Sequence, residues 1–323
     1  MTMKRIICSL IIAVAAIALV SCKSGVKEVE VGPYTVSIID DGVYHIQDYN
    51  SSNPAGEAFD AEGNKTHFNN CSDIYLIVGK EKALLIDLSN NIRWADNAAE
   101  SLRQIVAERT EGKELIITFT HNHGDHIGML HAYADDADVH FALPETDFQH
   151  LVTRFPVTDY SFVNEGHVFD LGGAEIEVIA VPGHTDGSVV FYMHGNNILF
   201  SGDAIGSGHG VWIFNTDAFT KYASAVPHLI GWLENPDNGV NINKLRIYGG
   251  HYWQRDWLPE LGNNEMGMPY IRDMQLLVNE IAEGTASTEP SGLDHPTLDT
   301  YFRNGTAIVV WNSEQAKQYA AGN

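Results

Sequence analysis

The stretch "ELIITFTHNHGDHIGML", residues 114–130, places three histidines and an aspartate directly after an apolar run. Residues 114–120 are short, apolar and rich in β-branched side chains, which predicts a buried strand. The side chains that follow it are His121, His123, Asp125 and His126. Imidazole and carboxylate are the usual protein ligands of zinc and similar divalent ions. The stretch therefore predicts a metal site at the end of a strand.

Three further runs with strand character end in the same way. "AEIEVIAVP" is followed by His184, "NNILFSG" by Asp203 and "KLRIYGG" by His251. Glycines precede these ligands and allow the backbone to approach an ion closely. Isolated surface histidines or helix caps would explain any one ligand, but not their coincidence after four strands. Since seven ligands exceed what one tetrahedral ion can use, we expect two metal ions.

These segments together resemble the metallo-β-lactamase superfamily. Its signature H-x-H-x-D-H is intact in "HNHGDH", and the later ligand segments match at "PGHTDGS", "SGDAIGSG" and "YGGHYW". The resemblance extends from about Tyr34 to the C-terminal region. It implies an α+β fold, the αββα four-layer sandwich, in which two mixed sheets are covered by outer helices and the metals lie at one edge.

The resemblance also assigns the ligands to two divalent ions, with Zn²⁺ expected and Fe or Mn as alternatives. The first ion is assigned His121, His123 and His184. The second is assigned Asp125, His126 and His251, with Asp203 bridging the pair. Two adjacent ions lower the pKa of a shared water and polarise the bond under attack. We expect Asp125 to be catalytic as well, by orienting the nucleophile.

The fold alone does not select a substrate, because the superfamily spans many reactions. Aspartate at position 203 resembles the lactonase and glyoxalase-II-like branches and departs from true β-lactamases, while Gly206 stands where many lactonases have tyrosine. We expect hydrolysis of a small ester, lactone or related acyl compound. The alternatives are a phosphodiesterase, a β-lactamase, or a mononuclear iron enzyme of the persulfide dioxygenase type. A non-catalytic binding protein should have lost a ligand, and none is missing.

Two segments beside the ligands, "SGDAIGSGHGVWIF" and "GGHYWQRDWLP", are candidates for the substrate pocket. Their aromatic side chains form either an apolar wall or ordinary core: Trp212, Phe214, Tyr252, Trp253 and Trp257. His209 is either a hydrogen-bond donor to substrate or an exposed loop histidine, and Arg255 is a candidate to hold a carboxylate. Such a wall favours a neutral or monoanionic substrate. Tyr248 is expected in the core of a sheet.

The N-terminus predicts export. Lys4 and Arg5 precede an apolar run over residues 6–20, which is typical of a signal peptide covering residues 1–21. The segment "LVSC" resembles the lipobox of bacterial lipoproteins, so Cys22 is the expected lipidation site, although an ordinary signal peptide with a chance cysteine remains the alternative. Residues 22–32 then form a lipidated tether and residues 33–323 the catalytic domain. We expect a lipid anchor in a bacterial membrane, on the periplasmic or cell-surface side.

Composition restricts the partners. The chain has 323 residues, is 44% hydrophobic and carries a formal net charge of −23, and removal of residues 1–21 makes it more acidic. Such a chain can bury a large core but repels nucleic acid. A small-molecule substrate is therefore expected, together with a membrane held through Cys22. No protein partner can be inferred. Cys71 would be the one cysteine of the folded part, as a buried filler.

Hydrophobic periodicity predicts the main elements. Hairpins are expected over residues 34–49, with a turn at Asp41-Gly42, and over residues 73–89. Helices are expected at residues 92–110, 125–133, 145–155, 218–234 and 270–284, with a break or kink at Pro227. Remaining strands are expected at residues 139–144, 174–181, 188–194, 196–202, 244–250 and 306–311.

Overall fold

The computed structural model describes residues 28–48, 58–59, 65–67, 72–155, 157–207, 210–251 and 266–322. The predicted signal peptide, Cys22 and most of the predicted tether lie outside these residues. So do several predicted pocket residues and one cysteine: Cys71, His209, Tyr252, Trp253, Arg255 and Trp257. Their predicted roles stay predictions.

The first sheet has eight strands in the order β1-β2-β3-β6-β7-β8-β9-β10. They are β1 (Val29–Val31), β2 (Tyr34–Asp40), β3 (Val43–Gln47), β6 (Asp73–Val78), β7 (Lys82–Ile86), β8 (Glu114–Thr118), β9 (Val139–Pro144) and β10 (Tyr160–Val163). Both predicted hairpins are present, β2 with β3 and β6 with β7. From β7 to β10 the strands run parallel. The end of the predicted tether pairs with this sheet as β1.

A second, five-stranded sheet has the order β11-β12-β13-β14-β16. Its strands are β11 (Val168–Asp170), β12 (Glu175–Ala180), β13 (Val189–Met193), β14 (Ile198–Gly202) and β16 (Arg246–Gly249). Two smaller sheets were not predicted. One joins β15 (Val211–Trp212), β19 (Ala307–Trp311), β18 (Thr300–Asn304) and β17 (Ser287–Pro290), and the other pairs β4 (Ala58–Phe59) with β5 (Lys65–His67).

The two large sheets pack face to face because their strands alternate between two buried faces. Ile77, Leu84 and Ile86 of the first sheet pack in one core cluster with Phe191 and Phe200 of the second. Tyr248 of β16 is buried in this same layer, as expected from the sequence.

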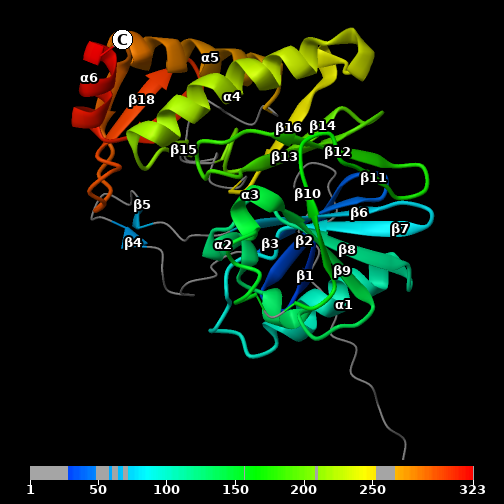
Figure 1. Cartoon of the computed structure of the whole chain (residues 1–323). Coiled ribbons are helices and arrows are strands. Elements are labelled where there is room, and N and C mark those ends of the chain that lie inside the picture. The colour runs from blue at the N-terminus through cyan, green and yellow to red at the C-terminus, as the bar shows by residue number, and fades with distance from the viewer. Residues whose placement is uncertain are drawn as a thin grey trace, which may run out of the picture.

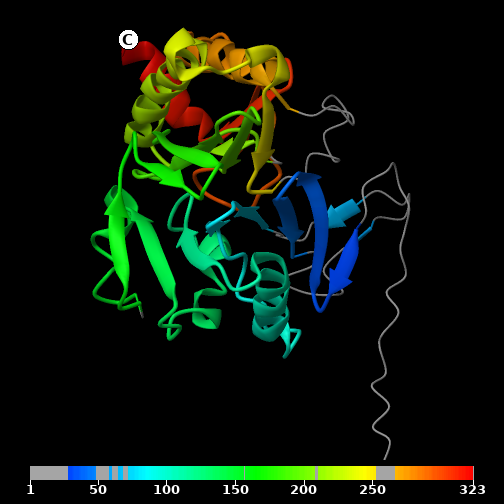
Figure 2. The ribbon, with the colours of Figure 1, turned by 90° about the vertical axis from the view of Figure 1, so that its right-hand side faces the viewer.

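Helices cover the two outer faces and complete the four-layer sandwich. The opposite face of the first sheet packs against α1 (Ala98–Thr110). The opposite face of the second sheet packs against α4 (Thr216–Glu234) and α5 (Met268–Glu283). Figure 1 shows α1 below the sheets and α4 and α5 above them, and Figure 2 shows the same layers after a quarter turn. The predicted αββα fold is confirmed. The third sheet and α6 (Ser313–Gly322) are added to the α4 and α5 layer.

Two predicted helices are shorter in the structure. The predicted helix 125–133 consists of α2 (Gly124–Ile127) and a 3-10 turn, Leu130–Ala132. Its helical ladder is interrupted because the N–H groups of Gly128 and Met129 donate to the carbonyls of Ser89 and Leu88 instead. The predicted helix 145–155 forms only α3 (Glu145–Phe148), followed by turns.

Of the two outcomes predicted at Pro227, a new start of the helix is wrong, since one helix runs from Thr216 to Glu234, while a kink stays a prediction. Proline in a helix interior costs about 3 kcal/mol. The buried face of α4 is continuous across this point, with Tyr222 and Val226 before it and Leu229 after it. Burial of these side chains against the second sheet offsets the cost. Within the described residues no helix is both long and apolar enough to cross a membrane.

The C-terminal sheet shares a core with the sandwich, so its disruption should destabilise the whole domain. Trp311 of β19 is fully buried and stacks on Phe219 of α4 with ring centroids 4.6 Å apart. We expect Trp311→Ala to lower the free energy of unfolding by about 3 to 5 kcal/mol in urea titrations. Leu276→Ala, at a side chain that is 52% exposed, is the control and should change it little. An equal, small effect of both variants would contradict this packing.

Candidate metal centre

The seven predicted ligands lie near the ends of four strands of the two large sheets. His121 follows β8, His184 lies between β12 and β13, Asp203 follows β14 and His251 follows β16. The remaining three ligands lie on α2 or directly before it: His123, Asp125 and His126. Because β14 and β16 run parallel, Asp203 and His251 leave the second sheet at the same end.

The ligand atoms converge in three overlapping groups, each with its atoms within 4.8 Å of one another. These groups are His121 with His123 and His184, His121 with His126 and Asp203, and Asp125 with His126 and His251. The first and third groups are the two triads that the resemblance implied. The second contains the residue assigned to the bridge. The structure thus brings all seven predicted ligands together.

Asp203 faces ligands of both triads. Its Oδ1 lies 3.5 Å from His126 Nε2, and its Oδ2 lies 3.5 Å from His184 Nε2 and 3.4 Å from His251 Nε2. The Ser207 hydroxyl donates a hydrogen bond of 2.9 Å to Oδ1 and fixes the carboxylate. This is the placement that a ligand shared between two ions requires.

The unpartnered nitrogens of the centre fit a divalent cation. His121 Nε2 and His126 Nε2 are buried and have no hydrogen-bond partner. A buried polar atom without a partner is costly, and a bound cation would satisfy both nitrogens. In addition, His184 Nε2 and His123 Nδ1 share a hydrogen bond of 2.9 Å. The two ring nitrogens are therefore close enough to bind one ion in place of the shared proton.

The opposite ring nitrogens are held by the protein, which fixes how the rings point. His121 Nδ1 lies 3.0 Å from Thr120 Oγ1, and His184 Nδ1 lies 3.0 Å from the carbonyl oxygen of Trp212. Metal-ligating histidines are usually oriented by such a second contact. The arrangement leaves the Nε2 atoms of both rings directed into the centre.

Burial and charge set the protonation of the ligands. Burial lowers the pKa of His184 to about 4, and burial together with the neighbouring His126 and His184 lowers that of His121. Both rings are therefore in the neutral form that binds metals. Burial alone would raise the pKa of Asp203, but the imidazoles of His251 and His126 hold it well below its usual range. Asp203 is thus ionised and suited to bind cations.

Asp87, at the end of β7, is a functional residue that the sequence analysis missed. It is 1% exposed and has a left-handed φ of 64°. Its Oδ1 accepts from the backbone N–H of Thr120 at 2.7 Å, and its Oδ2 lies 2.9 Å from His126 Nδ1. Asp87 therefore orients His126 and ties it to the end of β8. The sequence feature that could have indicated this role is the aspartate in "ALLIDLS", which follows an apolar run just as the predicted ligands do.

The sequence analysis also missed Asp147 of α3, whose carboxylate forms hydrogen bonds with two loops that carry candidate metal ligands. Its carboxylate accepts from Gly187 N at 2.7 Å, Thr185 Oγ1 at 2.7 Å and Asn122 N at 3.1 Å. Asn122 lies between two ligands of the first triad, and Thr185 follows the third. This buried carboxylate therefore fixes the relative positions of the two loops that carry the first triad.

Glycine is required where the His251 loop meets the ligands, as the sequence predicted. A Cβ atom on Gly250 would lie 2.5 Å from Asp203 Oδ1 and 2.6 Å from His126 Cε1, closer than such atoms approach. The carbonyl of Gly250 accepts from Asp73 N, and that of Gly249 accepts from Tyr75 Oη at 2.6 Å. Strand β6 of the first sheet thus holds a ligand loop of the second.

Phe214 forms an aromatic wall beside the first triad. Its ring centroid lies 5.8 Å from that of His123 and 5.7 Å from that of His184, and 6.4 Å from that of Trp212. Both Phe214 and Trp212 are half-buried and pack against the core under α4 and α5. Of the aromatic residues predicted for the pocket, these two are described, and Phe214 contacts the ligands.

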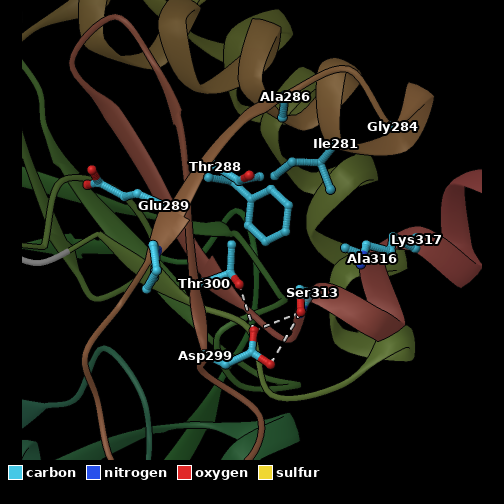
Figure 3. A pocket seen from close by; sticks show the side chains of 12 residues that line it. Ile281, Gly284, Ala286, Thr288, Glu289, Asp299, Thr300, Ser313, Ala316 and Lys317 are labelled. Atoms are coloured by element: carbon cyan, nitrogen blue, oxygen red, sulfur yellow. Dashed lines mark hydrogen bonds between the residues drawn. The ribbon is translucent and has the colours of Figure 1, made fainter.

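A cavity of about 560 Å³ lies elsewhere, between α5, β17, β18 and α6. Figure 3 shows Asp299 in this cavity directed at Ser313 and Thr300. The Asp299 carboxylate accepts from Ser313 N at 2.8 Å and from Thr300 Oγ1 at 2.7 Å. This acid therefore serves to hold the start of α6 against β18.

Comparisons with known proteins identify the family of the chain. A sequence model of the Metallo-beta-lactamase superfamily matches residues 72–239. An atrochrysone carboxyl ACP thioesterase of Aspergillus chevalieri is 30% identical over 259 residues, 78% of this chain and 77% of that protein. A hydroxyacylglutathione hydrolase of Ruegeria pomeroyi is 36% identical over 89 residues, 28% of this chain and 33% of that protein.

Structural similarity shows the same fold. A metallo-beta-lactamase from Pontibacter korlensis superposes with a TM-score of 0.54 at 19% identity, over 76% of this chain and 99% of that one. Several other matches to curated relatives are partial and span 36% to 55% of the relatives' own length.

Removal of the Asp87 charge should weaken metal binding without exposing the site. Asp87→Asn keeps the shape of the side chain but replaces one acceptor beside His126 by a donor. Since outer contacts of this kind typically change metal affinity about 10- to 100-fold, we expect a loss of that size for Zn²⁺ in competition with a chromogenic chelator. Asp138→Asn, at an exposed acid, is the matched control. Equal Zn²⁺ affinity in both variants would show that Asp87 does not orient a ligand.

Proposed function

The chain belongs to the metallo-beta-lactamase superfamily of hydrolases, and we propose that it hydrolyses an acyl thioester, or a related small ester or lactone, at a centre of two divalent ions. The observation that carries the proposal is the position of Asp203, whose two oxygens face ligands of both triads within 3.5 Å. Zn²⁺ is the proposed ion, with Fe or Mn as alternatives.

When bound, two such ions polarise the acyl carbonyl and lower the pKa of the attacking water. The chain supplies the positioning. Asp203 and the histidines of the two triads hold the ions, and Asp87 and Asp147 hold the ligand loops. The ligands come from strand ends and a short helix braced by both sheets, a rigid support of the kind that a catalytic constellation requires.

Asp125 is proposed to orient the attacking water as well as to bind the second ion. It is half-buried, and its Oδ2 lies 3.5 Å from His251 Nε2. Although burial alone would raise the pKa of Asp125, the charges of His126 and His251 lower it well below the usual range. The carboxylate is therefore ionised near neutral pH, the form that binds a cation and accepts a hydrogen bond from water.

The lining of the site supports an acyl substrate. Phe214 offers an apolar surface directly beside the first triad, and the Trp212 ring lies next to Phe214. Relatives of the chain include a protein named as an acyl-carrier-protein thioesterase and one named as a hydroxyacylglutathione hydrolase, and both names denote acyl substrates. A phosphodiester would be better matched by basic side chains than by aromatic rings.

The alternatives make different demands on the site. A mononuclear iron enzyme of the persulfide dioxygenase type would need one ion, whereas three overlapping ligand groups offer places for two. A β-lactamase shares the fold, but the likeness to such enzymes rests on structures below 25% identity and supports the fold alone.

Asp125→Asn should reduce thioester hydrolysis by the Zn²⁺-loaded chain about 100-fold in kcat, because misplacement of a reacting group by about 1 Å can cost that much. Release of thiol from an octanoyl thioester measures the rate, with Asp138→Asn as the exposed control. A chromogenic phosphodiester and a chromogenic β-lactam are assayed beside it. Faster turnover of either of these by the wild-type chain would overturn the proposed substrate class.

We also propose that residues 1–21 direct export and that Cys22 carries the lipid anchor. The support is the "LVSC" segment after a basic and then apolar N-terminus. A multiply acylated cysteine would hold the catalytic domain at a membrane surface, on the periplasmic or cell-surface side, where a small-molecule substrate reaches it.

Cys22→Ser should therefore abolish incorporation of labelled palmitate during expression in a bacterium and move the protein from the membrane to the soluble fraction. The reason is that the lipid is attached through the cysteine thiol, which serine lacks. Cys8→Ser, within the predicted signal peptide, is the matched control and should retain the label. Label retained in Cys22→Ser would refute the anchor.

A further inference from the structure

A loop of the C-terminal sheet reaches the aromatic wall of the metal centre. Residues 291–299 connect β17 to β18 and carry His295, whose ring centroid lies 5.8 Å from that of Phe214. Phe214 in turn lies 5.8 Å from His123 and 5.7 Å from His184. His295 thus lies one aromatic ring beyond two of the candidate metal ligands.

The His295 ring is exposed, but its loop is anchored. Leu298, three positions on, is fully buried in the core under α4 and α5. The N–H of Leu298 donates to the carbonyl of His295 at 3.2 Å, and the N–H of Ser291 donates to the carbonyl of Asp299 at 2.9 Å. A side chain presented by such a fixed loop loses little entropy when it binds a ligand.

Two contacts with Thr297 determine which ring nitrogen of the neutral His295 carries the proton. The backbone N–H of Thr297 donates to His295 Nδ1 at 3.3 Å, and Thr297 Oγ1 lies 3.1 Å from the same nitrogen. In the neutral ring one nitrogen accepts and the other donates. Nδ1 is therefore the acceptor, and Nε2–H is a donor on an exposed ring. This donor lies beyond the apolar ring of Phe214 as seen from the first triad. It therefore suits a ligand whose part near the metal site is apolar and whose far end carries a hydrogen-bond acceptor.

We propose that His295 is a specificity-determining residue, which donates from Nε2 to an oxygen on the distal part of an acyl chain lying over Phe214. This inference rests on the proposed function and narrows its substrate class to thioesters or esters whose acyl chain carries a keto, hydroxyl or ester oxygen well away from the scissile bond. The residue lies outside the segment that matches the superfamily, residues 72–239. A preference for such acyl chains would therefore come from the C-terminal part of the chain, outside the matched segment.

Two thioesters test the proposal. One is an octanoyl thioester, and the other is its analogue with a keto group on the penultimate carbon. The Zn²⁺-loaded wild-type chain should favour the keto analogue in kcat/KM by about two- to tenfold, the effect of one neutral hydrogen bond. His295→Phe keeps a ring against Phe214 but removes the donor, so the ratio should fall to about one. His295→Gln keeps a donor and should restore part of the preference.

Binding of the two free carboxylic acids, measured by calorimetry, gives a readout that does not depend on turnover. The wild-type chain should bind the keto acid more tightly than octanoate, and His295→Phe should bind both alike. His228→Phe, at an exposed histidine of α4 that pairs with Glu165, is the control and should keep the wild-type ratio. If neither thioester is hydrolysed, the proposed function fails while the binding ratio still decides the role of His295. An equal ratio in wild type and His295→Phe would overturn the inference and leave His295 as packing.

Discussion

The burial of ionisable ligands at one edge of two packed sheets is the constraint on which the rest of the structure depends. His121, His126 and Asp203 are at most 9% exposed. Charged and polar groups removed from water are tolerated only when they are paired, hydrogen-bonded or bound to a cation. Asp87 and Ser207 meet part of this requirement through hydrogen bonds to His126 and Asp203, and Asp147 does so through the loops that carry ligands. The inward-facing nitrogens that remain are the reason to expect cations.

Much of the fold could be predicted from local patterns. The β2 and β3 hairpin turns at Asp41-Gly42 as the sequence indicated, and Gly42 has the positive φ that such a turn favours. The seven ligands were recognisable because each follows an apolar run, and a sheet brings strand ends together. Helix lengths were less predictable. The predicted helix 125–133 stops early because Gly128 and Met129 bond to a loop that lies far from them in sequence.

The parts of the site that the sequence did not indicate depend on long-range contacts. Nothing local distinguishes Asp87 or Asp147 from other acids, and their roles follow from meeting Thr120, Thr185 and Gly187 in space. The same is true of His295. It reaches Phe214 because β15 pairs in parallel with β19, a contact between segments almost 100 residues apart. The C-terminal sheet thus both completes the core and brings His295 next to Phe214 beside the first triad.

The most direct test of the account is the metal content of the chain purified from residue 23 onward, measured by plasma emission for the wild type and for Asp203→Ala. Asp203 is the one ligand whose oxygens face both triads, so the account predicts close to two zinc-like ions per chain in the wild type and a fall toward one in the variant. One iron per chain, unchanged in Asp203→Ala, would contradict the dinuclear centre and redirect the search to oxygen-dependent chemistry.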